Sequence, residues 1–315
     1  MKKKTWIAGV LILLVLCIAI AALILWKRPR IKTDITEENI EVKGLKREYR
    51  FFFLSDSHIS LADERDDEEV RAKAAQRREN NRYEGFYSED YFDALIKEAG
   101  KRDEDLVILG GDIVDSAMYA SLEHVEKTLK QNGTEYLYYS GNHDFEYGAE
   151  YYSEKAYAEY LPRLAKLGRT QSYQVKEYDD LIIFAADDDS NKITPEALEA
   201  FKEVYEKGKP IVLCLHVPLE PGTGDTALWE MTKTFWGESE DGHSRVLLGV
   251  NSCYPNETTA EFMNLVFDAK SPVAVVIAGH IHFTHRDMLN DQTLQLVSGA
   301  AYEGKALQIT LTPAE

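Results

Sequence analysis

Cysteine is scarce in this chain. Only Cys17, Cys214 and Cys253 occur among 315 residues, and their number is odd. No spacing between them matches a disulfide framework or a zinc knuckle. We therefore expect small, buried or incidental side chains at these positions. The apolar content is normal, so an ordinary hydrophobic core can hold the fold instead.

Basic residues are also scarce after residue 32. Residues 33–315 contain 29 Lys and Arg against 54 Asp and Glu, a formal charge of −25. A surface this acidic repels nucleic-acid backbones and anionic membranes. Long nucleic acid is therefore disfavoured as a partner. A small nucleotide is not excluded, because a bound metal can invert the local field.

The chain has no internal repeat and no low-complexity tract, and a long hydrophobic run lies at its N-terminus. Residues 5–26 are uncharged and mostly apolar. About 22 residues at ~1.5 Å each are enough to cross a hydrocarbon core of ~30 Å. The run exceeds the ~7–15 apolar residues of a signal peptide. We predict that residues 1–32 form a basic tail and an uncleaved transmembrane anchor. A long signal peptide cleaved near Ala21-Ala22 is the alternative.

The charges that flank this run do not decide its orientation. Three lysines and the amino terminus precede it, and four basic residues follow it, so the positive-inside rule is nearly balanced. The short basic tail is similar to the start of a signal sequence, which stays inside. We therefore expect the rest of the chain on the extracytoplasmic side of the membrane. Residues 33–46 are polar and are predicted to form a linker.

Short apolar runs alternate with helical stretches through residues 47–315, which we assign to one domain. The runs are bounded by glycine, as is typical of strands in sheets covered on both faces. We expect strands over residues 49–54, 106–109, 136–140, 171–177, 181–185, 209–215, 273–278, 294–298 and 306–311. We expect helices over residues 91–100, 121–130, 149–167, 195–207 and 259–269. The acidic residues 187–190 are predicted to form a solvated loop, and 217–256 a long irregular stretch.

Five of these strands end in residues that commonly bind metals. The clearest is the run 106–109, which is followed by two glycines and Asp112. Glycine allows the backbone to turn sharply and to approach a ligand. The carboxyl end of such a strand is where open α/β sheets bind ligands. The complete set is Asp56, His58, Asp112, Asn142, His216, His280 and His282.

These side chains together predict a metal centre. Carboxylate with imidazole suits Mn, Fe and Zn better than Ca or Mg alone. Seven ligands exceed the needs of one transition metal, and they fit two divalent ions ~3.5–4 Å apart that share a carboxylate. Three further histidines, His124, His243 and His285, have no such context. We expect these three to be structural or at the surface.

The order of the motifs resembles that of the calcineurin-like metallophosphoesterase family. The motifs are Asp56-x-His58, Gly111-Asp112-x-x-Asp115, Gly141-Asn142-His143-Asp144, His216 and Gly279-His280-x-His282. Each is weak alone, but the five in this order are specific. The resemblance covers roughly residues 47–312. It implies a four-layer α/β/β/α sandwich around a two-metal site, preceded in this chain by the transmembrane helix.

The resemblance also implies a role for each ligand. One metal would be held by Asp56, His58 and His282, and the other by Asn142, His216 and His280, with Asp112 as the bridge. The metals would clamp phosphate oxygens and lower the pKa of a water, giving a hydroxide that attacks phosphorus in line.

His143 is not a ligand in this pattern. It would stabilise the transition state or protonate the leaving oxygen. Asp144 would orient the imidazole of His143 and favour its charged form. Purple acid phosphatases, a related group, have tyrosine where this chain has Asp115. A tyrosinate–iron(III) centre is therefore not expected, and Asp115 is predicted to fix a ligand histidine.

The segment 61–90 follows Asp56 and His58 directly. Charged residues over 63–79 indicate a solvent-facing helix, and aromatic residues follow them. The segment is either a surface insertion or a lid over the site, because its arginines could bind phosphate.

These features predict a membrane-anchored, metal-dependent phosphoric ester hydrolase. The sequence leaves open whether it cleaves monoesters or diesters, and whether its substrate is a phosphorylated small molecule or a lipid-linked one. A different class of function is a catalytically inactive scaffold that keeps the fold for protein binding. Missing ligands would indicate such a scaffold, and all seven are present here.

Overall fold

The computed structural model describes residues 30–133, 135–145, 154–188, 192–220, 227–238, 244, 246–249 and 256–314. The chain divides into two compact units, Met1–Lys32 and Thr33–Glu315. The predicted anchor over 5–26 lies outside the described residues, as do His243, Cys17 and Cys253. Within the described ranges, no helix has both the length and the apolar character needed to cross a membrane.

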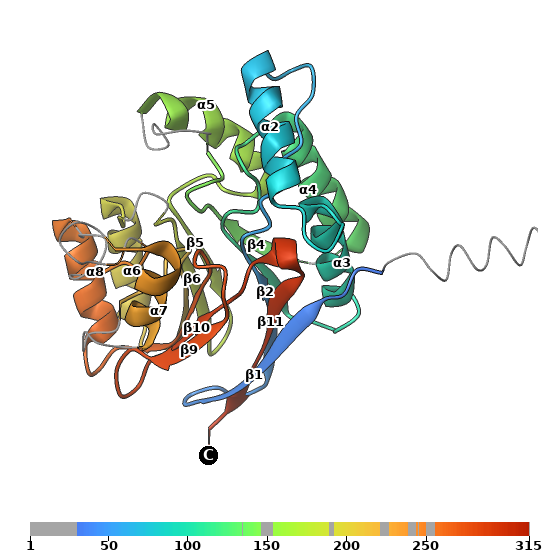
Figure 1. Ribbon diagram of the computed structural model, residues 1–315. Coiled ribbons are helices and arrows are strands. Elements are labelled where there is room, and N and C mark those ends of the chain that lie inside the picture. The colour runs from blue at the N-terminus through green and yellow to red at the C-terminus, as the bar shows by residue number, and fades with distance from the viewer. Residues whose placement is uncertain are drawn as a thin grey trace, which may run out of the picture. The chain divides into compact units, whose positions relative to one another are not determined.

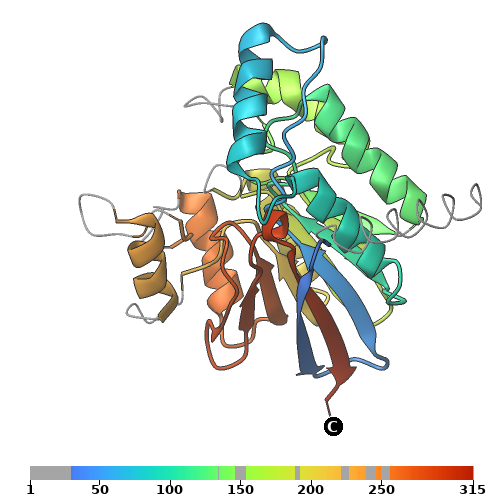
Figure 2. The same cartoon turned by 45° about the vertical axis from the view of Figure 1, so that its right-hand side comes forward.

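The described part of the second unit contains two β-sheets (Figures 1 and 2). The first has the spatial order β1 (Asp34–Val42), β11 (Lys305–Pro313), β2 (Tyr49–Leu54), β3 (Leu106–Gly110) and β4 (Tyr136–Tyr139). The second has the order β5 (Tyr173–Glu177), β6 (Ile182–Ala186), β7 (Ile211–Cys214), β8 (Val273–Ala278), β10 (Leu294–Val297) and β9 (His285–Met288). Strands β2 to β4 are mutually parallel, as are β6, β7, β8 and β10, so their carboxyl ends meet at one edge of each sheet.

Helices cover the outer faces of both sheets (Figure 1). The helices of the described residues are α2 (Glu68–Asn80), α3 (Ser88–Ala99), α4 (Tyr119–Asn132), α5 (Glu154–Leu164), α6 (Pro195–Tyr205), α7 (Ala227–Trp236) and α8 (Glu257–Phe267), with the short helices η1 (Ala165–Leu167) and η2 (Ala301–Glu303). The apolar faces of α3 and α4 pack on the first sheet. Those of α6 and α8 pack on the second.

Strand β2 shows why its sequence is apolar at almost every position. Phe51 and Phe53 point into the core between the two sheets, together with Ile183 of the second sheet. Phe52 and Leu54 point the other way, into the core beneath α3 and α4. When a strand is covered on both faces, its side chains face apolar cores on either side, so they are apolar at successive positions. The two facing sheets with outer helices give the α/β/β/α layers, and the expected two-sheet α/β fold is confirmed.

The prediction of a linker over 33–46 is wrong in its central part. Strand β1 pairs in parallel with β11, from Asp34 opposite Lys305 to Val42 opposite Pro313. Ile40 and Val42 pack against the core between the sheets. Acidic and amide side chains over 37–41 conceal this pattern, because β1 is an edge strand that buries only part of one face.

Two further elements occur where the sequence predicts none. Helix α7 lies within the stretch 217–256, whose prolines and glycines indicate irregular structure. Strand β9 pairs antiparallel with β10 at the end of the second sheet, and its sequence His-Arg-Asp-Met is half exposed and lacks apolar alternation. Short polar edge elements of this kind give little periodic signal.

Helix α2 confirms the predicted charged helix over 63–79. Of its 13 residues, Ala74 is the one that is buried. Helix α2 therefore has no apolar stripe, and its sequence does not indicate which face packs against the rest of the fold. Its C-terminal turn contacts the site described below.

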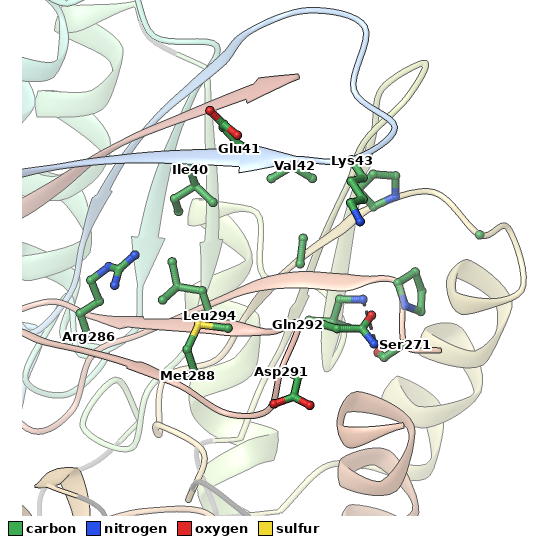
Figure 3. A pocket seen from close by; sticks show the side chains of 15 residues that line it. Ile40, Glu41, Val42, Lys43, Ser271, Arg286, Met288, Asp291, Gln292 and Leu294 are labelled. Carbon is green, nitrogen blue, oxygen red and sulfur yellow. Dashed lines mark hydrogen bonds between the residues drawn. The ribbon is translucent and has the colours of Figure 1, made fainter. Parts of the chain in front are cut away.

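A groove of about 770 Å³ opens between β1 and the beginnings of β8 and β10. Figure 3 shows Ile40 and Val42 on one side of it and Met288 and Leu294 on the other. Because β7, β8 and β10 run away from this groove, it lies at the opposite end of the second sheet from the residues that follow β7 and β8. The groove is therefore separate from the predicted metal ligands.

Candidate metal centre

The predicted ligands converge where the strands end. Ligand atoms of Asp56, His58 and His282 lie within 4.8 Å of one another, and so do ligand atoms of Asp112, His216 and His280. Asp56 and His58 follow β2, and Asp112 follows β3 in the first sheet. The histidines at 216, 280 and 282 follow β7 and β8 in the second sheet. The site thus draws on both sheets.

Asp112 lies between these two groups. Its Oδ2 is 3.1 Å from Nε2 of His216 and 3.8 Å from Nε2 of His58. Its other oxygen, Oδ1, accepts the backbone N–H of His143 at 2.7 Å. One oxygen is therefore held by the protein, while the other faces both groups.

The first group presents unsatisfied atoms to a common point. Oδ2 of Asp56 accepts hydrogen bonds from Ser55 Oγ at 2.6 Å and from the backbone N–H of His280 at 2.9 Å. Its Oδ1 is buried, makes no hydrogen bond with the described residues, and lies 3.3 Å from Nε2 of His282. Nε2 of His58 and Nε2 of His282 face each other at 3.2 Å.

The second group is arranged in a similar way. Nδ1–H of His216 donates to the carbonyl oxygen of Gly110 at 2.9 Å, which turns Nε2 toward Asp112. Nδ1 of His280 lies 3.2 Å from this Nε2. Burial, and next the nearby His216 charge, lower the pKa of His280 to about 3, so its imidazole is neutral.

Asn142 adds an amide to this group. It lies in the same loop as Gly141, where an added Cβ would come within 2.4 Å of Asp112 Oδ1. The Asn142 Oδ1 atom is buried and has no hydrogen-bond partner in the described part of the chain. Buried polar atoms normally have partners. Unfilled carboxylate and amide oxygens beside imidazole nitrogens are the donors that divalent transition metals prefer, so these residues fit metal binding.

The backbone turns sharply at most of these positions. The φ angles are positive at Asp56 (56°), His58 (48°), Asp112 (51°), His280 (69°) and His282 (62°). Such left-handed conformations are uncommon for residues other than glycine, and each costs about 1–3 kcal/mol. Strained residues of this kind cluster at functional sites, where the fold holds side chains in place.

The structure corrects the predicted role of Asp144. Its carboxylate accepts backbone N–H groups of Asp112 at 2.8 Å, Val114 at 3.0 Å and Gly141 at 2.7 Å, which uses both oxygens to brace the loops. Burial, and next the Asp112 charge, raise the pKa of Asp144 to about 7. Although Asp144 is next to His143 in the sequence, it points back into the loop rather than orienting the ring.

Asp115 is the carboxylate that orients His143. Its Oδ1 lies 2.9 Å from Nδ1 of His143 and 3.5 Å from Nδ1 of His58. Burial lowers the pKa of His143, but the charge of Asp112 and the hydrogen bond with Asp115 outweigh it, and the pKa lies above its usual value. The protonated imidazole is therefore favoured, as expected, but through Asp115.

Arg77 reaches this pair from the last turn of α2. Its Nε and Nη2 donate to the Asp115 carboxylate, with Nη2 3.0 Å from Oδ1, and Nη2 is 3.3 Å from Nδ1 of His143. Helix α2 is in turn held to α3 by the ion pair between Arg78 and Glu89. The segment 61–90 thus contributes directly to the site.

A cavity of about 270 Å³ lies over these residues. The described residues that line it are His58, Arg77, Asn81, Asp112, His143, Trp236, Val246, His280, His282 and Tyr302. Tyr302 Oη is 3.3 Å from Nδ1 of His282, and burial raises the pKa of Tyr302 to about 12. The indole N–H of Trp236 donates to the Ile281 carbonyl at 3.0 Å, with its ring edge-on to His282.

The prediction that the acidic run 187–190 is solvated is wrong for its first two residues. Asp187 and Asp188 are buried. Asp187 pairs with Arg169 and accepts the backbone N–H of Ser140. Asp188 accepts the backbone N–H of His216 at 2.9 Å, so it helps to place that histidine. Clustered acidic residues at a strand end can therefore hold site residues in place through hydrogen bonds to their backbone. Composition alone does not show this role.

The sequence does not single out Arg77, Asn81 or Tyr302. Arg77 lies on a helix without apolar periodicity, and Asn81 follows the end of that helix. Trp236 belongs to the stretch 217–256, whose aromatic residues favour substrate contact, but the helix that it ends is not predicted. The arginine content of 61–90 is the signal for Arg77. Of the histidines expected to be structural, His124 contacts Asp93 between α4 and α3, and His285 lies in β9.

A model of the calcineurin-like phosphoesterases matches residues 49–283, more than half of the chain. The chain belongs to the calcineurin-like phosphoesterase family. The predicted family is thereby confirmed, and so is the expectation of a metal-dependent phosphoric ester hydrolase. No curated protein matches the chain by sequence.

One solved structure supports the fold, and two others are less similar. A dimetal phosphatase from Danio rerio has 13% sequence identity and a TM-score of 0.50, and the match covers 81% of this chain and 88% of that one. A purple acid phosphatase from yellow lupin (Lupinus luteus) has 12% identity and a TM-score of 0.48, with 84% and 45% covered. A 5′-nucleotidase from Candida albicans has 12% identity and a TM-score of 0.43, with 85% and 48% covered.

Proposed function

We propose that this family member is a membrane-anchored phosphoesterase with two divalent transition metal ions, Mn, Zn or Fe. One ion is bound by Asp56, His58 and His282, and the other by Asn142, His216 and His280, with Asp112 as the bridge. The observation that carries the proposal is that one oxygen, Asp112 Oδ2, faces both groups, at 3.1 Å from His216 and 3.8 Å from His58. Two-metal sites share ligands in this way.

The protein side chains have separate tasks in this mechanism. When bound, the metals polarise the phosphoryl group and lower the pKa of a water. Nδ1 of His143 contacts Asp115, and we assign to Nε2 the donation of a proton to the leaving oxygen. Arg77 fixes Asp115 from the other side. Asp115 therefore sets the orientation of the ring and favours its charged form.

The membrane anchor rests on the apolar run over residues 5–26. Thr33 connects this run to β1, and the backbone N–H of Asp34 donates to the Gly304 carbonyl at 2.8 Å, close in sequence to Tyr302 of the cavity. The chain thus enters the folded unit beside the cavity. The proposed extracytoplasmic location rests on the short basic tail of residues 1–4, which is similar to the start of a signal sequence. The proposed substrates are phosphorylated small molecules or lipid-linked phosphoesters.

The central test uses the full-length protein in detergent, stripped of metal and reloaded with Mn, Zn or Fe(II). Metal content and turnover of p-nitrophenyl phosphate and bis-p-nitrophenyl phosphate are measured in parallel. We expect two metals per chain and metal-dependent turnover. Faster cleavage of the second compound indicates a phosphodiesterase, and faster cleavage of the first a phosphomonoesterase. No bound metal and no turnover would favour an inactive scaffold instead.

Removal of residues 1–32 tests the anchor separately. We expect the full chain in the membrane fraction of cells and the shortened chain in the supernatant, with unchanged turnover. Protease digestion of intact cells then tests the orientation, since an extracytoplasmic domain is cleaved from outside. Full-length protein in the supernatant would contradict the anchor.

A further inference from the structure

Two side chains of the segment 61–90 line the cavity together. Arg77 lies in the last turn of α2, and Asn81 follows the end of that helix. Residues four apart are neighbours on one helix face. The two residues therefore form one wall of the cavity, on the side where Arg77 approaches His143 at 3.3 Å.

Asn81 carries an unsatisfied donor. Its Nδ2 is buried and has no hydrogen-bond partner in the part of the chain that the structure describes. Buried donors are almost always paired, because an unpaired one is destabilising. An unpaired amide in the wall of a cavity above the metal ligands indicates that its partner arrives with a ligand.

Two other lining residues are different in character. Trp236 and Val246 also line the cavity. Trp236 is 42% exposed, and its N–H is already bonded to the Ile281 carbonyl, so the ring offers a fixed apolar face. A bound group that fills the cavity therefore meets both the hydrogen-bonding side chain of Asn81 and a flat apolar face.

The charges of the residues that line the cavity limit the kind of group that can bind beside Asn81. Among the described lining residues Arg77 is the one permanent cation, and it is already paired with the buried Asp115. The described lining residues therefore offer no further cation to a second phosphate group. They favour an uncharged group beside Asn81, with oxygen atoms that accept or donate hydrogen bonds.

We propose that Asn81 is a specificity-determining residue that hydrogen-bonds a hydroxyl of the leaving group, and that the substrates are phosphoesters of sugars or other polyols. A polyol has hydroxyls for Asn81 and a carbon face for Trp236. His143 lies on the same side of the cavity as Arg77. The leaving oxygen is therefore next to the wall that Arg77 and Asn81 form. This inference rests on the proposed phosphoesterase activity and adds the class of substrate.

The test compares glycerol 3-phosphate with propyl phosphate on the metal-loaded, full-length enzyme. The two esters have the same charge and chain length and differ in their hydroxyls. We expect the wild type to prefer the glycerol ester in kcat/KM. Asn81→Ala should reduce this preference about fivefold to tenfold, mainly through KM, which corresponds to one hydrogen bond. The loss in kcat/KM should be smaller for propyl phosphate, which has no hydroxyl for Asn81, and metal content should be kept.

Asn80→Ala is the matched control, because Asn80 is the preceding residue of the same type and is exposed. It should behave as the wild type. Equal losses on both esters in Asn81→Ala, or a change in melting temperature alone, would overturn the inference and leave a purely structural amide. Cleavage of aryl phosphate without any preference for the glycerol ester would also overturn it while the proposed function stands. No turnover of any ester would contradict both.

Discussion

Asp115→Asn is the substitution that tests the arrangement around His143 most directly. The change keeps the size of the side chain and removes its charge. Oδ1 of Asp115 lies 2.9 Å from Nδ1 of His143, 3.0 Å from Nη2 of Arg77 and 3.5 Å from Nδ1 of His58. The carboxylate is completely buried, so solvent does not screen these contacts.

The size of the effect follows from the bond that is lost. A hydrogen bond to a charged group contributes about 1.5–3 kcal/mol. If the bond to His143 is needed in the transition state, kcat falls about 10-fold to 150-fold. Asp115 also lies behind His58, and loss of such a supporting contact weakens metal affinity by about 10-fold to 100-fold. Both effects should appear in this one variant.

The assay is steady-state turnover of an aryl phosphate at saturating metal, with metal content measured on the same samples. Saturation compensates for weaker binding and isolates the effect on kcat. Asp180→Asn is the control, because Asp180 is also a buried carboxylate and accepts hydrogen bonds from Tyr49 Oη and the backbone of Lys46. It lies beside the beginning of β2, away from the strand ends. It should lose stability while turnover is kept.

A wild-type kcat in Asp115→Asn would refute the assignment of Asp115 to His143. Complete loss of one metal even at saturation would mean that Asp115 matters through His58 alone. Equal losses of turnover in the Asp180→Asn control would show that general destabilisation explains the result.

Asp112→Asn should remove the carboxylate charge that both ligand groups share. Metal analysis should then find both ions lost, and turnover should be nearly abolished. Retained activity would disprove the shared ligand. His143→Ala should slow turnover by about 10²-fold to 10⁴-fold with near-normal metal content, and stoichiometric loss of metal would show that His143 is a ligand. The hydrogen bond with Asp93 raises the pKa of His124, so it stabilises the fold below pH ~6.5 and less as the pH rises through the raised pKa. The difference in urea midpoint between wild type and His124→Gln should therefore shrink from pH 6 to pH 9, and a constant difference would contradict this.

The strand ends were predictable because two signals coincide there. Each is a short apolar run, which indicates a buried strand, followed at once by a metal-binding residue type. Asp112 after 106–109 and His216 after 209–215 are examples, and both lie at the site. Parallel strands place their carboxyl ends at one edge, so the sequence pattern already implies proximity.

The contacts around His143 were less predictable because they depend on the direction of side chains. Asp144 is adjacent in sequence, whereas Asp115 comes from another loop and is the one that reaches the ring. Only the fold decides which carboxylate points inward. Arg77 is similar, since its helix has no apolar stripe to indicate which of its arginines faces the site.

The edge elements were missed for a different reason. Strand β1 carries acidic residues on its exposed side and gains much of its stability from pairing with β11. Tertiary pairing of this kind overrides weak local preference. The pairing of β1 with β11 cannot be predicted from the local sequence of either strand.

The pairing of β1 with β11 also affects how the chain can fold during synthesis. The partners Asp34 and Lys305 are roughly 270 residues apart, and β11 lies between β1 and β2 in the sheet. At translation rates of roughly 5–20 residues per second, β1 waits about 15 to 50 seconds for its partner. The first sheet therefore closes only after β11 has been synthesised. Until then the edges of β1 and β2 are exposed, so a nascent chain of this protein depends on protection from aggregation.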